Sequence, residues 1–262
     1  MDTILQEKGS RCMVFIGIDL AWTYRNETGI CVISADGVVE LLDSKIYSNG
    51  DILEVIKSHG SDEEICIAID APLIVNNESG SRGAEGALMR ARIHGHRLSA
   101  FNSNRNYFNK VFGDIRGETL RKVIQLEISN VRIGFSDSES NLVETFPTGI
   151  CCGLFPEIYP VKYKRKPKIT FEETCSHMEV LLKRFEEIEK LERHVSGLAS
   201  RLEVDITALT RKQHKHIEDK IDAFLCAYGM YSIHKGLADG RMFGNVEGGF
   251  IMLPVKGEVQ NN

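Results

Sequence analysis

The topology of this chain follows from the stretch Cys12-Met13-Val14-Phe15-Ile16-Gly17-Ile18-Asp19, a continuous apolar run rich in β-forming residues. Such a run is typical of a strand that is buried on both faces of a sheet. A second run at 30–34 follows polar turn residues, and the dipeptide Asp36-Gly37 separates it from a third run at 38–42. Short turns of this kind join antiparallel strands. Residues 12–43 are therefore predicted to form a three-stranded antiparallel meander.

The meander is expected to continue into a parallel part of the same sheet. Residues 51–59 carry apolar side chains at helical spacing and precede another apolar strand at 65–70. A helical crossover places such a strand beside the first one and parallel to it. Further elements are predicted as helices near 82–95, 117–130, 171–193 and 215–234, and as strands at 141–146 and 249–253. Without a repeat or a sharp compositional break, residues 1–262 are predicted to be a single domain in which roughly 150–210 form a helical insertion or cap.

The composition is that of a globular protein, with 42% hydrophobic and 26% charged residues. A formal net charge of −5 argues against bulk electrostatic coating of nucleic acid, so any such contact has to be local. The seven cysteines form no Cys-x-x-Cys pair and several lie in apolar runs, which favours buried thiols in a reducing cytoplasm. The polar residues 1–11 and the lack of a long apolar run predict neither a signal peptide nor a membrane span.

Two of the predicted strands end in the same way, with Asp19 after Ile16-Gly17-Ile18 and Asp70 after Ile67-Ala68-Ile69. If the strands are parallel neighbours, the two carboxylates emerge at one edge of the sheet, about 4.8 Å apart. Carboxylates this close repel each other, so one of them is protonated or both share a cation. A divalent ion with oxygen ligands is the simplest solution. The alternative for each aspartate alone is the capping of a turn or helix.

Three more acidic residues are candidates for the same site. Glu144 lies on the apolar strand predicted at 141–146, where a charged side chain is unexpected unless it has a functional role. Asp219 and Asp222 are three residues apart on one predicted helix face, and Asp222 adjoins an apolar stripe. The alternatives are an exposed position on an edge strand for Glu144 and a solvated charge for Asp219.

At these residues the sequence resembles the family known as domain of unknown function 429, whose members are predicted nucleases of the RNase H-like fold. The resemblance rests on the segments 17–22, 68–73, 82–85, 144–147 and 222–227, which span most of the chain in the family's order. It implies an RNase H-like α/β fold, a mixed sheet flanked by helices, with Asp19, Asp70, Glu144 and Asp222 around one site and Asp219 nearby. Thr145-Phe146 departs from the family's usual tyrosine after the glutamate.

The first functional hypothesis is a nuclease that uses Mg²⁺ or Mn²⁺ to hydrolyse phosphodiester bonds in DNA or RNA. Asp19 would bridge two metal ions, and the other carboxylates would complete their ligand shells. The candidate substrate contacts are Arg82 with Glu85, the lone Trp22, and the lysine-rich segment 162–168. In that segment Lys162, Lys164 and Arg165 would bind phosphates, and Tyr163 would be available to stack on a base. The alternatives are a helix-start ion pair for Arg82, core packing for Trp22 and an exposed solvated loop for 162–168.

Two further hypotheses belong to other functional classes. An actin-like nucleotide-binding protein shares this core, but it needs glycine-rich phosphate loops where this chain has Leu20-Ala21-Trp22 and Ala71-Pro72-Leu73. A non-catalytic module that binds nucleic acid or protein would be expected to lose one or more of the acidic positions, and none is missing. Four histidines lie near the candidate segments. Exposed polar positions explain His94 and His96 better than metal binding does, and His214 and His216 precede Asp219, where a histidine could assist proton transfer.

Overall fold

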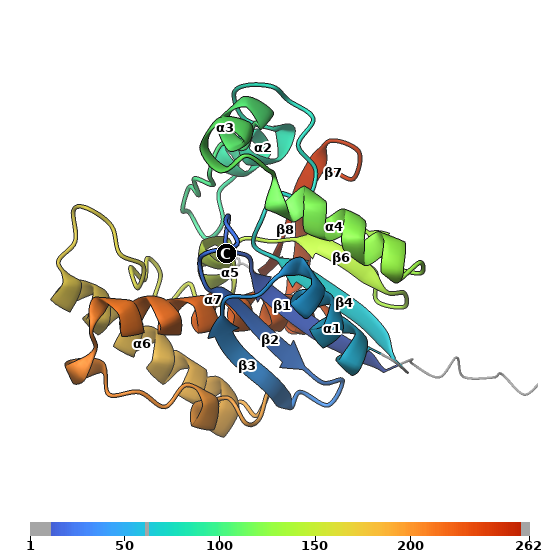
Figure 1. Cartoon of the computed structure of the whole chain (residues 1–262). Helices are drawn as coiled ribbons and strands as arrows, with labels where there is room; N and C mark the ends of the chain where they lie inside the picture. Colours follow the sequence, from blue (N-terminus) through green and yellow to red (C-terminus); the bar gives the residue numbers. More distant parts are fainter. Residues whose placement is uncertain (1–11, 61–62, 258–262) are drawn as a thin grey trace, which may run out of the picture.

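The computed structural model describes residues 12–60 and 63–257, and Figure 1 shows its arrangement. Residues 1–11, on which the signal-peptide expectation rests, lie outside the described part. A six-stranded mixed sheet runs in the order β3-β2-β1-β4-β6-β5, and β7 and β8 form a separate two-stranded sheet. The elements are β1 (Met13–Asp19), β2 (Thr28–Ile33), β3 (Val39–Lys45), α1 (Asn49–His59), β4 (Glu64–Ile69), α2 (Gly83–Arg90), α3 (Arg105–Phe112), α4 (Arg116–Glu127), β5 (Arg132–Ile133), β6 (Asn141–Glu144), α5 (Pro147–Leu154), α6 (Phe171–Lys190), α7 (Arg211–His234), β7 (Asp239–Asn245) and β8 (Gly249–Val255).

The first three strands form the predicted antiparallel meander. β1 pairs with β2 in the register Gly17↔Cys31, and β2 pairs with β3 in the register Cys31↔Leu42. The turn between β2 and β3 uses Gly37 at φ +81°, a left-handed conformation that glycine adopts without strain. The prediction for residues 12–43 is therefore confirmed.

The predicted parallel half of the sheet is also confirmed. Helix α1 begins with a capping box in which Ser48 and Asp51 satisfy each other's backbone N–H groups, and it leads into β4. β4 is parallel to β1, with Ile18 opposite Ile69, and β6 is parallel to β4, with Glu144 opposite Ile69. The carboxyl ends of β1, β4 and β6 consequently lie at one edge of the sheet.

Helices cover both faces of this sheet (Figure 1). Alternate residues of β1 face opposite sides, so Val14 and Ile16 pack in a core cluster with α1 and α4, whereas Met13 and Phe15 pack with α7. Helix α7 crosses behind β1, β2, β3 and β4. The structure is thus a mixed α/β arrangement with helices on both sides of the sheet.

Several elements differ from the sequence-based expectation. The strand predicted at 249–253 exists as β8, but it pairs with β7, which the sequence did not predict because most of its residues are exposed. Helix α3 was also not predicted from the sequence. The segment 162–168 was expected to be an exposed loop, which is wrong for Tyr163 and Lys164, because the tyrosine is 2% exposed and the lysine is mostly buried. Among the described helices, none is long and apolar enough to cross a membrane.

Candidate metal centre

Three aspartates from separate parts of the chain meet at the edge where the parallel strands end. Asp19 is the last residue of β1, Asp70 follows β4, and Asp222 lies on α7. The backbone N–H of Asp70 donates to the carbonyl of Ile18 at 2.9 Å, which extends the β1–β4 ladder up to the site. One carboxylate oxygen from each aspartate lies within 4.8 Å of the others. We call these three residues the carboxylate triad.

Helix α7 reaches the sheet because two glycines face it. A Cβ atom at Gly17 would lie 2.1 Å from the carbonyl oxygen of Ala223, and a Cβ atom at Gly29 would lie 2.1 Å from that of Asp219. No side chain fits at these distances, so the backbone of α7 lies directly on β1 and β2. This close approach positions Asp222 beside the strand ends.

Burial and repulsion between the carboxylates disfavour negative charge on Asp19 and Asp70. Burial, with Asp222 and Asp70 next in importance, raises the pKa of Asp19 well above its usual value. Burial also raises the pKa of Asp70 to about 7, although Lys164 opposes the shift. Desolvation and like-charge repulsion are the two causes that a bound cation would relieve.

Asp222 is held by two residues of the segment that precedes α6. The hydroxyl of Tyr163 donates to Asp222 Oδ1 at 2.5 Å, and the ammonium of Lys164 lies 2.6 Å from Asp222 Oδ2. Burial lowers the pKa of Lys164, but the three aspartates outweigh it and raise that pKa above its usual range. Lys164 is therefore a charged counter-ion inside the site. Tyr163 uses its hydroxyl here and is buried, so the expectation that its ring is free to stack on a base is wrong.

A second acidic pair extends the site along α7. Lys215 lies 2.6 Å from Asp219 Oδ1 and 2.9 Å from Glu218 Oε1. Burial raises the pKa of Asp219 and of Glu218, against the lowering effect of Lys215. After burial and Lys215, an interaction with the side chain of Asp19 also lowers the pKa of Asp219. Together with the triad, five carboxylates face the two ammonium groups of Lys164 and Lys215.

Glu144 lies at the same edge of the sheet but has its own partner. Arg82 binds it with both terminal nitrogens, at 2.9 Å to Oε2 and 2.5 Å to Oε1, and Leu73 N–H donates to Oε2 at 2.9 Å. The other side of Arg82 binds Glu85, with Nε donating to Oε1 at 2.8 Å. All three charged side chains are almost fully buried. Within the described residues the structure does not bring Glu144 into the triad, and it places Arg82 and Glu85 in a buried ion-pair network.

Two cavities open on either side of Asp19 and Trp22. The smaller one, about 180 Å³, is lined by Asp70, Arg82, Glu144 and Phe101 among others. The larger one, about 670 Å³, is lined by basic and acidic side chains that include Arg25, Lys212, Lys215, His216 and Asp219. Asp19, Leu20 and Trp22 line both. Asp19 is therefore accessible from both cavities, and Asp70 from the smaller one.

A family model described as "Protein of unknown function (DUF429)" matches residues 17–247. The chain belongs to this family. The matched range contains every acidic residue of the site, and the match confirms the family that the sequence motifs predict. No curated protein and no solved structure gives a match.

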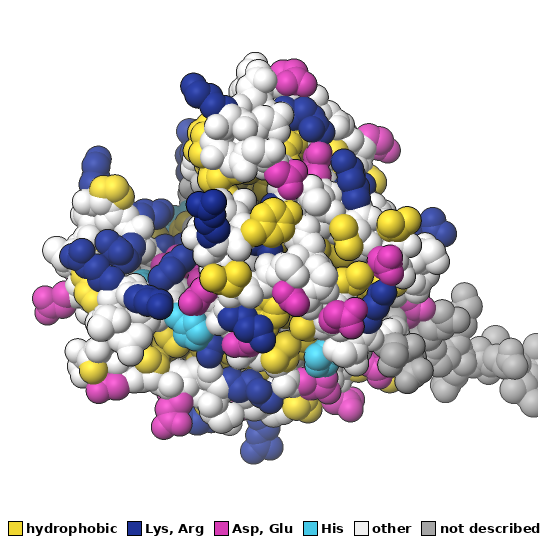
Figure 2. Space-filling view, in the orientation of Figure 1, with side chains coloured by type: hydrophobic (Ala, Val, Ile, Leu, Met, Phe, Trp, Pro, Cys, Tyr) yellow, Lys and Arg dark blue, Asp and Glu magenta, His cyan; other side chains and the backbone are white. Residues whose placement is uncertain are grey.

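Of the residues that contact the carboxylates of this DUF429 protein, Lys215 was not predicted from the sequence and Tyr163 was predicted in a different role. Lys215 stands four residues before Asp219 in the helical spacing of an ion pair, which is a signal that the sequence does contain. The hydroxyl of Tyr163 has no such signal, because its contact with Asp222 joins residues far apart in the chain. Lys162 and Arg165 are exposed neighbours of these residues. Figure 2 shows Lys and Arg side chains gathered on this side of the molecule, where α6 and α7 begin.

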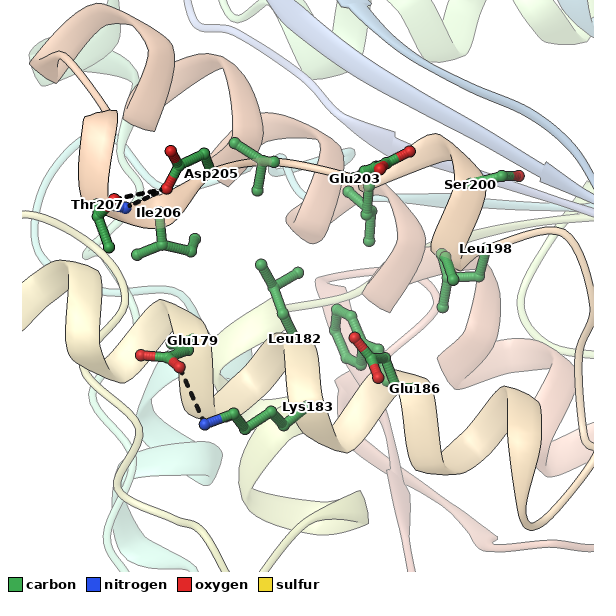
Figure 3. A pocket seen from close by; sticks show the side chains of 14 residues that line it. Glu179, Leu182, Lys183, Glu186, Leu198, Ser200, Glu203, Asp205, Ile206 and Thr207 are labelled. Atoms are coloured by element: carbon green, nitrogen blue, oxygen red, sulfur yellow. Dashed lines mark hydrogen bonds and ion pairs between the residues drawn. The ribbon is translucent and has the colours of Figure 1, made fainter.

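A separate groove of about 560 Å³ lies between α6 and residues 198–207 (Figure 3). Its floor is apolar, with Leu182, Leu198 and Ile206 pointing into it. Its rim carries Glu179 and other carboxylates, and Lys183 is already paired with Glu179 at 2.9 Å. An acidic rim repels phosphate, and no triad residue lines this groove, so the candidate site is the one at the strand ends.

Proposed function

We propose that this DUF429 protein has an RNase H-like core and is a nuclease that hydrolyses phosphodiester bonds with Mg²⁺ or Mn²⁺ bound at the carboxylate triad. The observation that carries the proposal is the convergence of Asp19, Asp70 and Asp222 to within 4.8 Å. The strand order β3-β2-β1-β4-β6-β5, with an antiparallel meander followed by parallel strands, supports the fold assignment. A fold alone does not determine a reaction, so the proposed activity depends on the geometry of the carboxylate triad.

The donor set suits a hard divalent cation. Carboxylate oxygens are the ligands that Mg²⁺ and Mn²⁺ prefer, and these ions need only a few of them because they retain several waters. Burial and repulsion raise the pKa of Asp19 and of Asp70, so these two side chains are unfavourable as free anions. A bound ion of this type polarises the phosphate and lowers the pKa of a coordinated water.

The chain's own residues supply placement and charge. Asp19, Asp70 and Asp222 would hold the ion at the end of β1 and β4, and Tyr163 and Lys164 orient Asp222 by binding one oxygen each. Arg82 neutralises Glu144 and also donates to the carbonyl of Ile74 at 2.8 Å, which fixes the segment that follows β4. Glu144 is thus a positioning residue in this proposal rather than a metal ligand.

The test combines metal binding with cleavage. Purified wild-type protein should gain thermal stability with Mn²⁺ and cleave labelled DNA or RNA oligonucleotides. Asp19→Asn and Asp222→Asn should reduce both the stabilisation and the cleavage. Activity should fall about 100-fold or more, because even the residues that hydrogen-bond to metal ligands change metal affinity or activity by about 10–100-fold. Asp239→Asn is the matched control, since this aspartate is exposed on β7.

Three outcomes would contradict the proposal. Cleavage that survives Asp19→Asn would remove the triad from the mechanism. Stabilisation by ATP and not by Mn²⁺ would favour nucleotide binding on an actin-like fold. Binding of nucleic acid without metal dependence or cleavage would favour a non-catalytic module.

A further inference from the structure

We propose that the substrate of this site is single-stranded nucleic acid, with one unpaired base in the smaller cavity and the adjoining phosphate chain along the larger one. The inference rests on the proposed nuclease function and names its substrate class. It follows from the way in which the two cavities meet at Asp19 and Trp22, beside the carboxylate triad.

The smaller cavity has an aromatic wall beside the triad. Trp22 and Phe101 both line it, and their ring centroids lie 4.6 Å apart with a tilt of 59°. Phe101 is 42% exposed although it is a large apolar side chain, so part of its ring faces outward and is available for contact. Aromatic faces of this kind stack on nucleobases with little regard to sequence.

The size of this cavity selects an unpaired base. Its volume of about 180 Å³ is below the roughly 300–1,000 Å³ of pockets that enclose drug-sized ligands. One planar heterocycle fits such a space, whereas a base pair with its stacked neighbours does not. A duplex would have to release a base to reach the triad, which costs unstacking energy that a single strand does not pay.

The larger cavity supplies cations for the phosphate chain. Arg25 and Lys212 line it, both are exposed, and within residues 12–60 and 63–257 neither side chain pairs with a carboxylate. Lys215 also lines it but is bound to Asp219 and Glu218. Because the protein as a whole carries a charge of −5, this local group of free cations marks a path rather than a general affinity for polyanions.

The larger cavity also contains negative charge, which limits where the phosphates lie. Glu27 accepts from His216 Nδ1 at 2.8 Å, and Asp219 is held by Lys215 at 2.6 Å. Both acids thus have basic partners, whereas Arg25 and Lys212 do not. A mononucleotide would use only the smaller cavity, and a longer strand gains the contacts of the larger one.

The test is binding of fluorescent single-stranded DNA, single-stranded RNA and duplex of equal length, measured by anisotropy in Ca²⁺. We expect either single strand to bind at least tenfold more tightly than duplex. Phe101→Ala should weaken that binding about tenfold, the order of one base–aromatic stack, and Phe101→Trp should retain it. Lys212→Ala should weaken it severalfold and reduce the slope of log K against log salt by about 0.7. Leu126→Ala and Lys183→Ala are controls, since both residues are exposed and line neither cavity.

The outcomes separate this inference from the proposed function. Equal or tighter binding of duplex, or single-strand binding that Phe101→Ala leaves unchanged, overturns the inference even if Mn²⁺-dependent cleavage is found. Single-strand preference with loss in both variants but without cleavage supports the inference and rejects the nuclease. Equal kcat/KM for a small phosphodiester and for a single-stranded oligonucleotide also overturns it, because the larger cavity would then contribute nothing.

Discussion

Replacing Asp70 by asparagine should stabilise the metal-free protein at alkaline pH. Burial raises the pKa of this aspartate to about 7 in the folded chain, against about 3.9 in an unfolded one. A pKa difference of about 3 corresponds to about 4 kcal/mol, the cost of ionising Asp70 in the folded protein. Asparagine has nearly the same shape and no charge, so it removes this cost.

The sign of the effect follows from proton binding. Between about pH 4 and pH 7 the folded protein holds a proton on Asp70 that the unfolded chain has released, so the wild type loses stability as the pH rises. The advantage of Asp70→Asn should therefore be small near pH 4 and grow by about 2–3 kcal/mol between pH 5 and pH 8. Lys164 would then face one carboxylate fewer, which offsets part of the gain.

Urea denaturation in EDTA at pH 5, 6, 7 and 8 measures this directly. Asp43→Asn is the control of opposite sign: burial raises the pKa of Asp43, but hydrogen bonds from Tyr47 and Lys45 outweigh it and lower that pKa. This control should be destabilised at pH 8. Lower stability of Asp70→Asn than of the wild type at pH 8 without metal would refute this prediction. With Mn²⁺ the order should reverse, because only the wild type retains the full ligand set.

Three other substitutions have expected outcomes that follow from single contacts. Arg82→Met leaves two buried carboxylates unpaired and should lower the free energy of unfolding, measured in urea, by about 3–5 kcal/mol. Arg132 is the control, because its side chain is 79% exposed and its ion pair is 3.9 Å long, so Arg132→Met should change that free energy by no more than about 0.5 kcal/mol. Equal losses in the two variants would contradict this prediction. Lys164→Met should lower the melting temperature in EDTA and increase the gain on adding Mn²⁺, because the ion then replaces the missing cation; an unchanged gain would argue against a shared site. Gly29→Ala should lower both stability and Mn²⁺ affinity by pushing α7 away from the sheet, while Gly83→Ala, where an added Cβ has nothing within 4 Å, should do neither.

The sheet and the triad could be predicted because each depends on a local pattern. Apolar runs of strand length, a two-residue turn and one crossover helix are enough to determine which strands are neighbours. Once β1 and β4 are parallel neighbours, Asp19 and Asp70 must emerge at the same edge. Asp222 was recognised because it adjoins the apolar stripe by which α7 packs on the sheet.

The partners of these acids could not be predicted in the same way. Lys164 stands among Lys162, Lys166 and Lys168, which share its local surroundings in sequence but are exposed. Only tertiary packing turns Lys164 toward Asp222, and it does so together with the neighbouring Tyr163. The same holds for Glu144, whose pairing with Arg82 joins positions 62 residues apart.

Lys164, which is mostly buried, and Lys215, whose side chain is 58% exposed, determine how many ions the site takes. The carboxylates of Asp19, Asp70, Asp222, Asp219 and Glu218 oppose the two ammonium groups, which leaves about three negative charges when all are ionised. One divalent ion reduces this to one negative charge, whereas two ions leave an excess of positive charge in a buried place, which is costly until a phosphate arrives. We therefore expect a Mn²⁺ titration followed by EPR to give one bound ion per chain without nucleic acid. Two ions bound equally tightly in the absence of an oligonucleotide would mean that Lys164 and Lys215 do not act as the second cation.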